Sequence, residues 1–370
     1  MTEGYRAMPP GEYRFVILWA VGLLLLYAVG GYFGAGLLRE YAAETARTRQ
    51  ALIASATTEP NRREPTSQLP VGAKPVAVTA GGRINDIGEF SLRESGWTAD
   101  FNLWFNWSGD AVKPGAGFRV VNGEILKREK VDSYHRGTEH YEEYHVVARI
   151  TKHFDASRFP FAEEGLFIQI EDATQGAEAL RYVADERNSS VATEAMPRAV
   201  KLTGFLVGTR IGSFRSGRVD PGHADGMIKV RSQLFLAMLG KPDSMGVYIK
   251  TFQALFAAVA VALIVLFIKP IHVDPRFGVP VGGFFAAVGN NIYVGAILPH
   301  SDRHTLADMV NATGLLTIFL ILVQSAVALF IEDSLNNERL RRLFDHVSFA
   351  VFLLGYLAVN IVLPLAARAP

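Results

Sequence analysis

The chain has no cysteine among its 370 residues, and this absence removes several kinds of chemistry. Disulfide bonds, thiolate nucleophiles and cysteine-ligated zinc sites are all excluded. An excess of either charge is also missing, because 37 lysines and arginines face 36 aspartates and glutamates, for a formal net charge of +1. A nucleic-acid binder needs a concentrated positive field, so the composition argues against nucleic-acid partners.

Familiar catalytic motifs are missing as well. The sequence contains no G-x-S-x-G, no H-E-x-x-H and no glycine loop of the kind that cradles phosphate. Its carboxylates are scattered and form no paired constellation. We therefore predict that the protein is not an enzyme and that it needs no cofactor or metal for catalysis.

Long apolar runs are what the sequence does contain. Residues 15–38 form a run of 24 residues without a charge, long enough for a bilayer span of about 20 residues. We interpret it as a retained anchor, since the apolar core of a signal peptide is only about 7–15 residues long. The remaining candidates are 252–268, 312–331, 347–367 and a weaker, glycine-rich segment, 277–299. The sequence thus predicts five membrane spans.

The short loops between these spans carry most of their basic residues on one side of the membrane. These residues are Lys269, Arg276, Arg339, Arg341 and Arg342. Because cytoplasmic loops are enriched in lysine and arginine, the bias predicts a cytoplasmic N-terminus and a large domain on the opposite side. We also expect the arginines of the 335–344 segment to meet lipid phosphates.

Between about residues 71 and 248 the hydrophobic period changes to two. Phe101, Leu103, Phe105 and Trp107 alternate with more polar neighbours, and glycine- or proline-containing turns separate such runs. Many short alternating strands with this punctuation are typical of a β-sandwich. The predicted fold class is α+β, with a stub and anchor (1–38), a helical or flexible linker (39–70), a β-sandwich (71–248) and a four-helix membrane bundle (249–370).

The passage HFDASRFPFAEEGLFIQIED, residues 153–172, resembles the signature loop of pentameric ligand-gated ion channels, the Cys-loop receptor superfamily. Members of that family carry an aromatic-Pro-Phe-Asp core before an alternating strand, and Phe159, Pro160 and Phe161 match it. Three further segments resemble, in family order, the second strand, the last strand with its entry into the membrane, and the loop after the pore helix. They are residues 99–110, 234–252 and 297–316.

The resemblance implies a homo-pentamer whose second bundle helix, here the 277–299 segment, lines a central pore. When Pro299 is matched to the loop proline of the family, the pore-lining positions are Asp274, Gly278, Gly282, Phe285, Gly289, Ile292 and Ala296. Their alternating spacing of four and three keeps them on one helix face. The resemblance assigns cation selectivity to a ring of Asp274 and the gate to Phe285 and Ile292. Asn290 and Asn291 are expected either to contact ions or to hydrogen-bond between helices.

The resemblance also implies a route that couples the sandwich to the pore. The matching residues are Glu94, Phe159, Pro160, Phe161, Lys241, Leu298, Pro299 and His300. The chain departs from the family pattern at Ala162, which replaces an aspartate, and at Gly278 and Gly282, which replace hydroxyl side chains. These departures leave open an alternative, a non-conducting membrane receptor or scaffold that retains the channel fold.

Three places are candidates for sensing a ligand or protons. The capping-loop residues Phe214, Arg215 and Arg218 suit an anionic ligand. His140 and His145 in EHYEEYH suit protons or a divalent cation, and His300 and His304 suit protons or zinc. An ordinary hydrated hairpin or loop is the alternative for both histidine clusters. Expected partners are other copies of the chain, membrane lipids, permeant ions and a small-molecule ligand or protons, in a bacterial inner membrane with the large domain in the periplasm.

Overall fold

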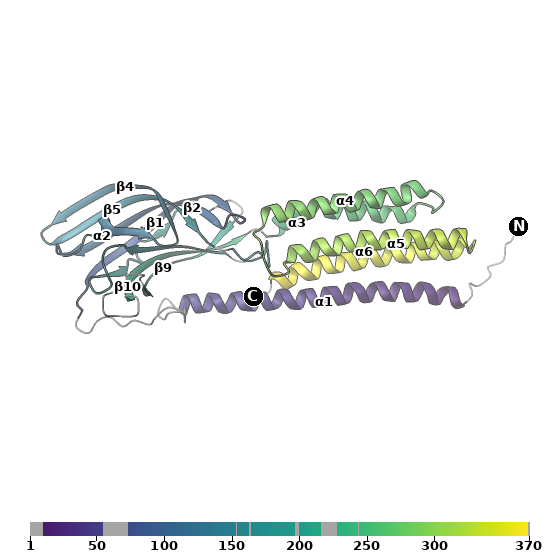
Figure 1. Cartoon of the computed structure of the whole chain (residues 1–370), viewed down its shortest axis with the longest axis horizontal. Coiled ribbons are helices and arrows are strands. Elements are labelled where there is room, and N and C mark those ends of the chain that lie inside the picture. The colour runs from purple at the N-terminus through teal and green to yellow at the C-terminus, as the bar shows by residue number, and fades with distance from the viewer. Residues whose placement is uncertain are drawn as a thin grey trace. The chain divides into compact units, whose positions relative to one another are not determined.

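The computed structural model describes residues 10–54, 73–152, 154–162, 164–196, 200–215, 228–242 and 244–368 (Figure 1). The chain is α+β, with a long N-terminal apolar helix, two β-sheets and four long apolar helices packed together, as the sequence predicts. Its contacts divide it into two compact units. The helical unit comprises Met1–Glu44, Asp155–Ala162 and Ser244–Pro370, and the sheet unit comprises Thr45–Phe154 and Glu163–Asp243.

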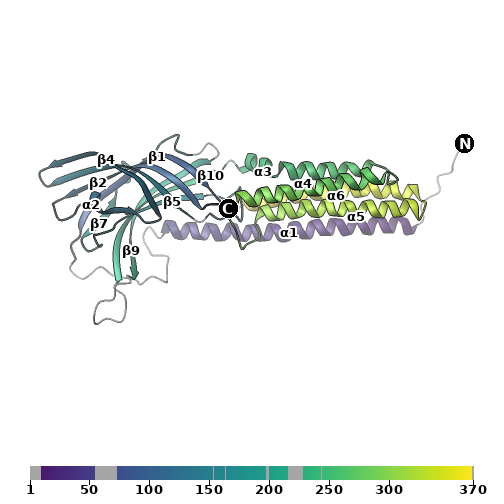
Figure 2. The ribbon, with the colours of Figure 1, turned by 45° about the horizontal axis from the view of Figure 1, so that its top comes forward.

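The helices of the helical unit run side by side in both views (Figures 1 and 2). They are α1 (Pro10–Ala54), α3 (Ser244–Ile264), which continues into the short 3₁₀ helix η1 (Val265–Phe267), α4 (Val273–Ile297), α5 (Leu306–Asp333) and α6 (Glu338–Arg368). Five helices in the described part of the chain are long and apolar enough to cross a membrane. They indicate a multi-pass membrane protein. Helix α1 continues past residue 38 to Ala54, so the first part of the predicted helical or flexible linker (39–70) is helical.

Local sequence explains where α5 begins. The Thr305 hydroxyl accepts a hydrogen bond from the Asp308 amide at 3.1 Å, and the Asp308 carboxylate accepts one from the Thr305 amide at 2.9 Å. This reciprocal capping box satisfies two amide groups that the first helical turn would otherwise leave unpaired. Helix α5 therefore starts at Leu306, directly after the loop that follows α4.

Helix α1 packs along α5 and α6. The Trp19 indole donates a hydrogen bond to the Ser348 hydroxyl at 3.1 Å, and its ring lies 5.4 Å from that of Phe344. Farther along α1, the Tyr27 and Thr317 hydroxyl oxygens are 2.7 Å apart. Two polar contacts and an aromatic contact, spread over several turns, make α1 a packed member of the helical unit.

The sheet unit contains two sheets. The larger sheet has the strand order β4-β5-β2-β1-β7, with β8 also paired to β1, and the smaller has the order β3-β6-β10-β9. The strands are β1 (Val76–Ser91), β2 (Gly96–Ser108), β3 (Phe118–Val120), β4 (Gly123–Arg136), β5 (Glu139–Thr151), β6 (Glu164–Asp172), β7 (Leu180–Ala184), β8 (Ser190–Val191), β9 (Val200–Arg215) and β10 (Ile228–Pro242), and a short helix α2 (Pro114–Gly117) precedes β3.

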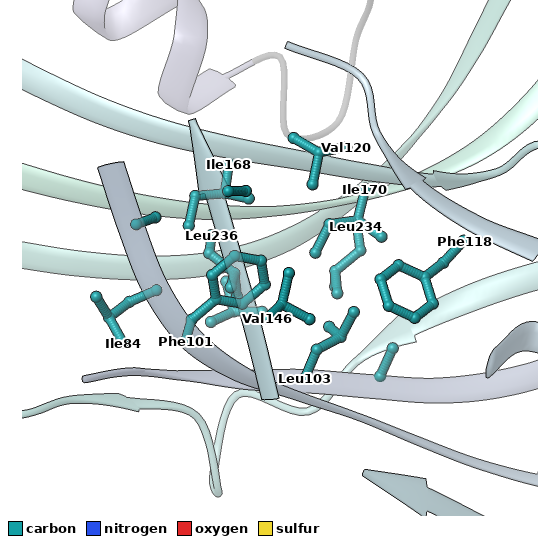
Figure 3. Close-up of a cluster of buried hydrophobic side chains, with 14 of the residues drawn as sticks. Ile84, Phe101, Leu103, Phe118, Val120, Val146, Ile168, Ile170, Leu234 and Leu236 are labelled. Atoms are coloured by element: carbon teal, nitrogen blue, oxygen red, sulfur yellow. The ribbon is translucent and has the colours of Figure 1, made fainter. Parts of the chain in front are cut away.

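The core of this unit lies between the two sheets. Figure 3 shows Phe101, Leu103 and Val146 from the larger sheet pointing toward Ile168 and Leu236 from the smaller one. All five are fully buried. Full burial of each such side chain stabilises the fold by roughly 1.5–3 kcal/mol. The period-two pattern in the sequence thus marks the inward face correctly, and the predicted sandwich is confirmed.

Candidate functional site

Helix α4 has two unlike faces. Its buried residues are Arg276, Pro280, Gly283, Ala287, Asn290 and Val294, and the neighbouring helices are α3 and α5. A Cβ atom built on Gly283 would lie 3.1 Å from the Ala258 carbonyl oxygen, so glycine lets α3 approach closely here. The helix continues through Pro280 without a break. The packed face accounts for one of the glycines that the sequence concentrates in this segment.

The other face of α4 is exposed in the single chain. It contains all seven predicted pore positions, which are Asp274, Gly278, Gly282, Phe285, Gly289, Ile292 and Ala296. No atom lies within 4 Å of a Cβ built on Gly278, Gly282 or Gly289, so packing within the chain does not require glycine there. Phe285 and Ile292 are each 69% exposed. The face therefore combines small residues, one carboxylate and two large apolar side chains. That it lines a pore stays a prediction.

The exposed face of α1 is built differently. Leu18, Leu25 and Tyr32 are among its large side chains that have no cover within the chain. Large apolar side chains suit contact with lipid tails, and exposed glycines occur on α1 as well, at Gly22, Gly30 and Gly36. What distinguishes the exposed face of α4 is the carboxylate of Asp274, a group that lipid tails do not accommodate.

The two asparagines of α4 have separate environments. The Asn290 amide donates a hydrogen bond to the Asn311 side-chain oxygen at 3.0 Å, and both residues are buried. Hydrogen bonding between helices, one of the two interpretations of this pair, therefore applies to Asn290, which joins α4 to α5. Asn291 is exposed.

A buried ionic cluster lies at the start of α4, and the sequence did not indicate it. Arg276 is 0% exposed, and its guanidinium lies 2.6 Å from the Asp345 carboxylate on α6. The same carboxylate lies 2.9 Å from the Arg341 guanidinium and accepts a hydrogen bond from the Gln324 amide at 2.8 Å. Buried charges are tolerated only when paired, and this cluster pairs them.

The cluster corrects two predictions made from the loop charges. Arg276 lies in the first turn of α4 and is buried, so it is not an exposed loop charge. Arg341 is buried against Asp345 and Glu332 and does not meet lipid phosphates. A signal was available, because Arg341 and Asp345 are four residues apart and so share a helix face.

The segment Asp155–Ala162, which connects β5 to β6, lies within the helical unit. The Ser157 carbonyl oxygen accepts a hydrogen bond from the Leu306 amide at the start of α5, at 2.8 Å. The Arg158 guanidinium donates to the Ala367 carbonyl oxygen near the end of α6, at 3.2 Å. This segment, the coupling loop of the sequence prediction, is thus bonded to two helix ends.

Aromatic contacts hold the same loop to a third helix. The Phe161 ring lies 5.7 Å from the Tyr248 ring of α3, and the Arg368 guanidinium lies 4.9 Å from the Phe161 ring centre. Pro160, which follows a cis peptide bond, is buried, and Phe159 is half-buried. The three residues that match the family core therefore occupy one docked turn. The sequence indicated these residues but not what they would contact.

The loop between α4 and α5 contains the remaining predicted coupling residues. Leu298 is buried, Pro299 is half-buried, and His300 is exposed, as is His304. Among the described residues there is no group of three or more side chains that could hold a metal ion, so neither histidine belongs to one. His300 and His304 remain candidates for sensing protons or zinc.

The same loop is tied to α1 through a residue that the sequence did not single out. The Arg303 guanidinium forms a two-pronged ion pair with the Glu44 carboxylate, at 2.6 and 3.0 Å, and lies 5.4 Å from the Tyr41 ring centre. The hydrogen bond to Glu44 raises the pKa of Arg303 further above neutral pH. Helix α1 thus reaches the loop that follows α4.

Glu94 and Lys241 are two of the predicted coupling residues, and the partner that the structure gives Glu94 is Arg149. The Glu94 carboxylate lies 2.9 Å from the Arg149 guanidinium, and both side chains are exposed. The side chain of Lys241 lies outside the described residues, as do that of Arg215 and the whole of Arg218. Phe214, in β9, is half-buried.

The histidines of EHYEEYH fall into two separate groups. His145 lies 2.9 Å from the Asp100 carboxylate, whereas His140 stacks on Trp107 with 5.0 Å between ring centres. Their separation of five residues places them on opposite faces of β5. Between them, burial and a hydrogen bond to Glu143 raise the pKa of Tyr141 above its usual range.

Sequence reasoning missed the partner of His140. His135 lies directly opposite it across the β4–β5 hairpin, and their Nδ1 atoms are 3.0 Å apart. The signal was the turn between them, because Gly137 and Thr138 close a tight hairpin and set the register. Counting outward from that turn pairs the two histidines.

No protein-family model matches the chain, and no curated protein matches it either. The exposed face of α4, the docked loop and the side-chain clusters therefore carry the functional argument.

Proposed function

We propose that the chain is one subunit of a pentameric ligand- or proton-gated ion channel, cation-permeable, of the Cys-loop receptor type. The observation that carries this proposal is the exposed face of α4, with its glycines, Asp274, Phe285 and Ile292. Such a face is ill-suited to lipid, and it gains a purpose when several copies surround a shared axis and enclose water and ions.

Each part of that face has a role in the proposed pore. A ring of Asp274 carboxylates concentrates cations and repels anions at one mouth. Rings of Phe285 and Ile292 form apolar constrictions that close the path by excluding water. Arg276 lies only two residues from Asp274, and its buried pairing with Asp345 turns its positive guanidinium away from the proposed pore.

The docked loop supports a coupling role. Asp155–Ala162 follows β5 in the chain and precedes β6, and it contacts α3, α5 and α6 through Phe161, Ser157 and Arg158. A ligand or proton bound to the sheet unit would act on the helices through this loop, by favouring one of two states of the channel. The proposal places the sheet unit in the periplasm and the N-terminus in the cytoplasm of a bacterial inner membrane.

The test is cation flux into liposomes that contain the purified full chain, recorded at several pH values and compared with the Asp274→Lys variant. We expect cation-selective flux, and we expect Asp274→Lys to abolish or reverse the selectivity. The matched control is Asp333→Lys, the same charge change at an exposed end of α5. Unchanged selectivity in Asp274→Lys would remove the role assigned to Asp274. The number of copies is a separate question, and images of single particles would show whether five copies assemble.

A specific observation favours the second candidate, a non-conducting receptor or scaffold. Gly278 and Gly282 leave their part of the face without hydroxyl groups that could replace the hydration shell of an ion. An intact pentamer that passes no ions under any condition would support this candidate instead.

A further inference from the structure

Two histidines meet at the tip of the β4–β5 hairpin. His135 and His140 are direct cross-strand partners, flanking the turn formed by Gly137 and Thr138. Gly137 has φ +65°, a conformation that glycine adopts without strain. The Nδ1 atoms of the two imidazoles are 3.0 Å apart, and their ring centres are 4.3 Å apart. The backbone thus fixes the two rings side by side.

His140 is held in place by its neighbours. Its ring stacks nearly parallel on Trp107, at 10° between planes and 5.0 Å between centres. Its Nε2 atom is buried, makes no hydrogen bond and lies 3.2 Å from the Asp110 carboxylate. A carboxylate this close favours the proton on Nε2, which leaves the Nδ1 lone pair free and facing His135.

This arrangement has the parts of a metal site. Histidines that bind a metal usually donate a hydrogen bond from their other nitrogen to a carboxylate, and the exposed Asp110 carboxylate, 3.2 Å from His140 Nε2, is within reach for that role once it is reoriented. An imidazole nitrogen binds Zn²⁺ at about 2.0–2.1 Å. At that distance, two nitrogens that are 3.0 Å apart subtend an angle of about 95° at a shared ion. This is near the right angle between adjacent ligands in tetragonal Cu²⁺ and Ni²⁺ sites.

We propose that His135 and His140 form a two-imidazole site for a divalent late transition metal, Cu²⁺, Ni²⁺ or Zn²⁺. In the metal-free site, one proton lies between the two Nδ1 atoms. When the metal binds both Nδ1 atoms, this proton moves to Nε2 of His135, so both imidazoles stay neutral. No group of three or more metal-ligating side chains occurs in the described residues, so water completes the coordination. Affinity follows the general order for nitrogen ligands, with Cu²⁺ bound more tightly than Ni²⁺ or Zn²⁺.

The bound ion would join β4 to β5 next to the turn that closes their hairpin. It binds the folded hairpin and not the separated strands, and therefore stabilises the sheet unit by mass action. The site does not depend on the channel proposal, because none of its residues belongs to α4 or to the docked loop.

The experiment uses the full-length protein without a polyhistidine tag, in detergent micelles, titrated with Ni²⁺ while tryptophan fluorescence is recorded. Because Trp107 stacks on His140, we expect saturable quenching with one ion per chain, reversed by EDTA. His135→Ala and His140→Ala should each weaken binding by about tenfold or more, since each removes one of the two ligands. Calorimetry on Trp107→Phe should show binding retained without the quenching.

His145→Ala is the matched control, because His145 is on the same strand but faces the other side of the sheet. It should bind Ni²⁺ as the unchanged protein does. His135 is exposed, so His135→Gln serves as a second variant if His140→Ala fails to fold. Wild-type affinity in a folded His135 variant, or an equal loss in His145→Ala, would overturn the proposal.

Discussion

The Arg276 guanidinium lies 2.6 Å from the Asp345 carboxylate, with both side chains buried, and this contact joins the first turn of α4 to α6. The two residues are 69 positions apart in the chain. Arg276 also donates a hydrogen bond to the Ile268 carbonyl oxygen, between α3 and α4. The start of α4 is thus tied to its neighbours by a charged group turned away from its exposed face.

Asp345→Asn should strongly destabilise the helical unit. The change leaves the buried guanidinium groups of Arg276 and Arg341 without their shared counter-ion, and breaking a buried pair in this way costs about 3–5 kcal/mol. Denaturant unfolding of the full chain in detergent measures the difference. Asp333→Asn, which removes an exposed carboxylate from the end of α5, should leave the free energy of unfolding nearly unchanged. Equal stability of both variants would contradict a structural role for the pair.

Phe161→Ala should destabilise the docking of the loop on α3. Phe161 is only 5% exposed and packs between Tyr248 and Arg368. Removing a buried phenylalanine ring costs about 3–5 kcal/mol, because apolar contacts are lost and a cavity remains. The half-buried Phe159 gives the comparison, and Phe159→Ala should cost less. The free energies of unfolding of the two variants are compared. A larger loss of stability in Phe159→Ala than in Phe161→Ala would show that Phe161 is not the main contact between the loop and α3.

Phe285→Ala tests the proposed gate. The side chain is 69% exposed within the chain, so its loss should leave the folded subunit intact while widening the apolar constriction. We expect cation flux into liposomes in the absence of any stimulus. Val281 is also exposed on α4 but is not one of the seven predicted pore positions. Val281→Ala should therefore show no cation flux in the absence of a stimulus. Background flux equal to that of the unchanged protein would count against a gate at Phe285.

Glu44→Gln tests whether α1 acts on the loop after α4. The substitution removes the partner of Arg303 but keeps the size of the side chain. Because both groups are exposed, assembly should be unaffected, whereas the stimulus needed for half-maximal flux should shift. Glu40→Gln, one turn earlier on α1, is the control. A response that both variants leave unchanged would restrict α1 to anchoring.

The elements themselves could be predicted because their signals are local. A span needs only a long apolar run, and a sandwich strand needs only alternation, so residues 15–38 and Phe101 to Trp107 were interpreted correctly. The face of α4 also followed from spacing, since helical geometry alone puts Asp274, Phe285 and Ile292 on one side. The helix continues to Ala54, within the predicted helical or flexible linker, because the residues after 38 can extend a helix that no proline interrupts before 60.

The sequence by itself determined the five apolar helices, the alternating strands and the residues that share the exposed face of α4, since each depends on chain period and composition. Only the tertiary structure decided that Arg276 is paired with Asp345, that Ser157 caps the start of α5, and that Arg303 is held by Glu44. The physical reason is distance along the chain. The sequence around a charged side chain or a carbonyl group does not indicate which distant residue it will pair with. That partner is selected only when packing brings the two helices, or the loop and the helix end, into contact.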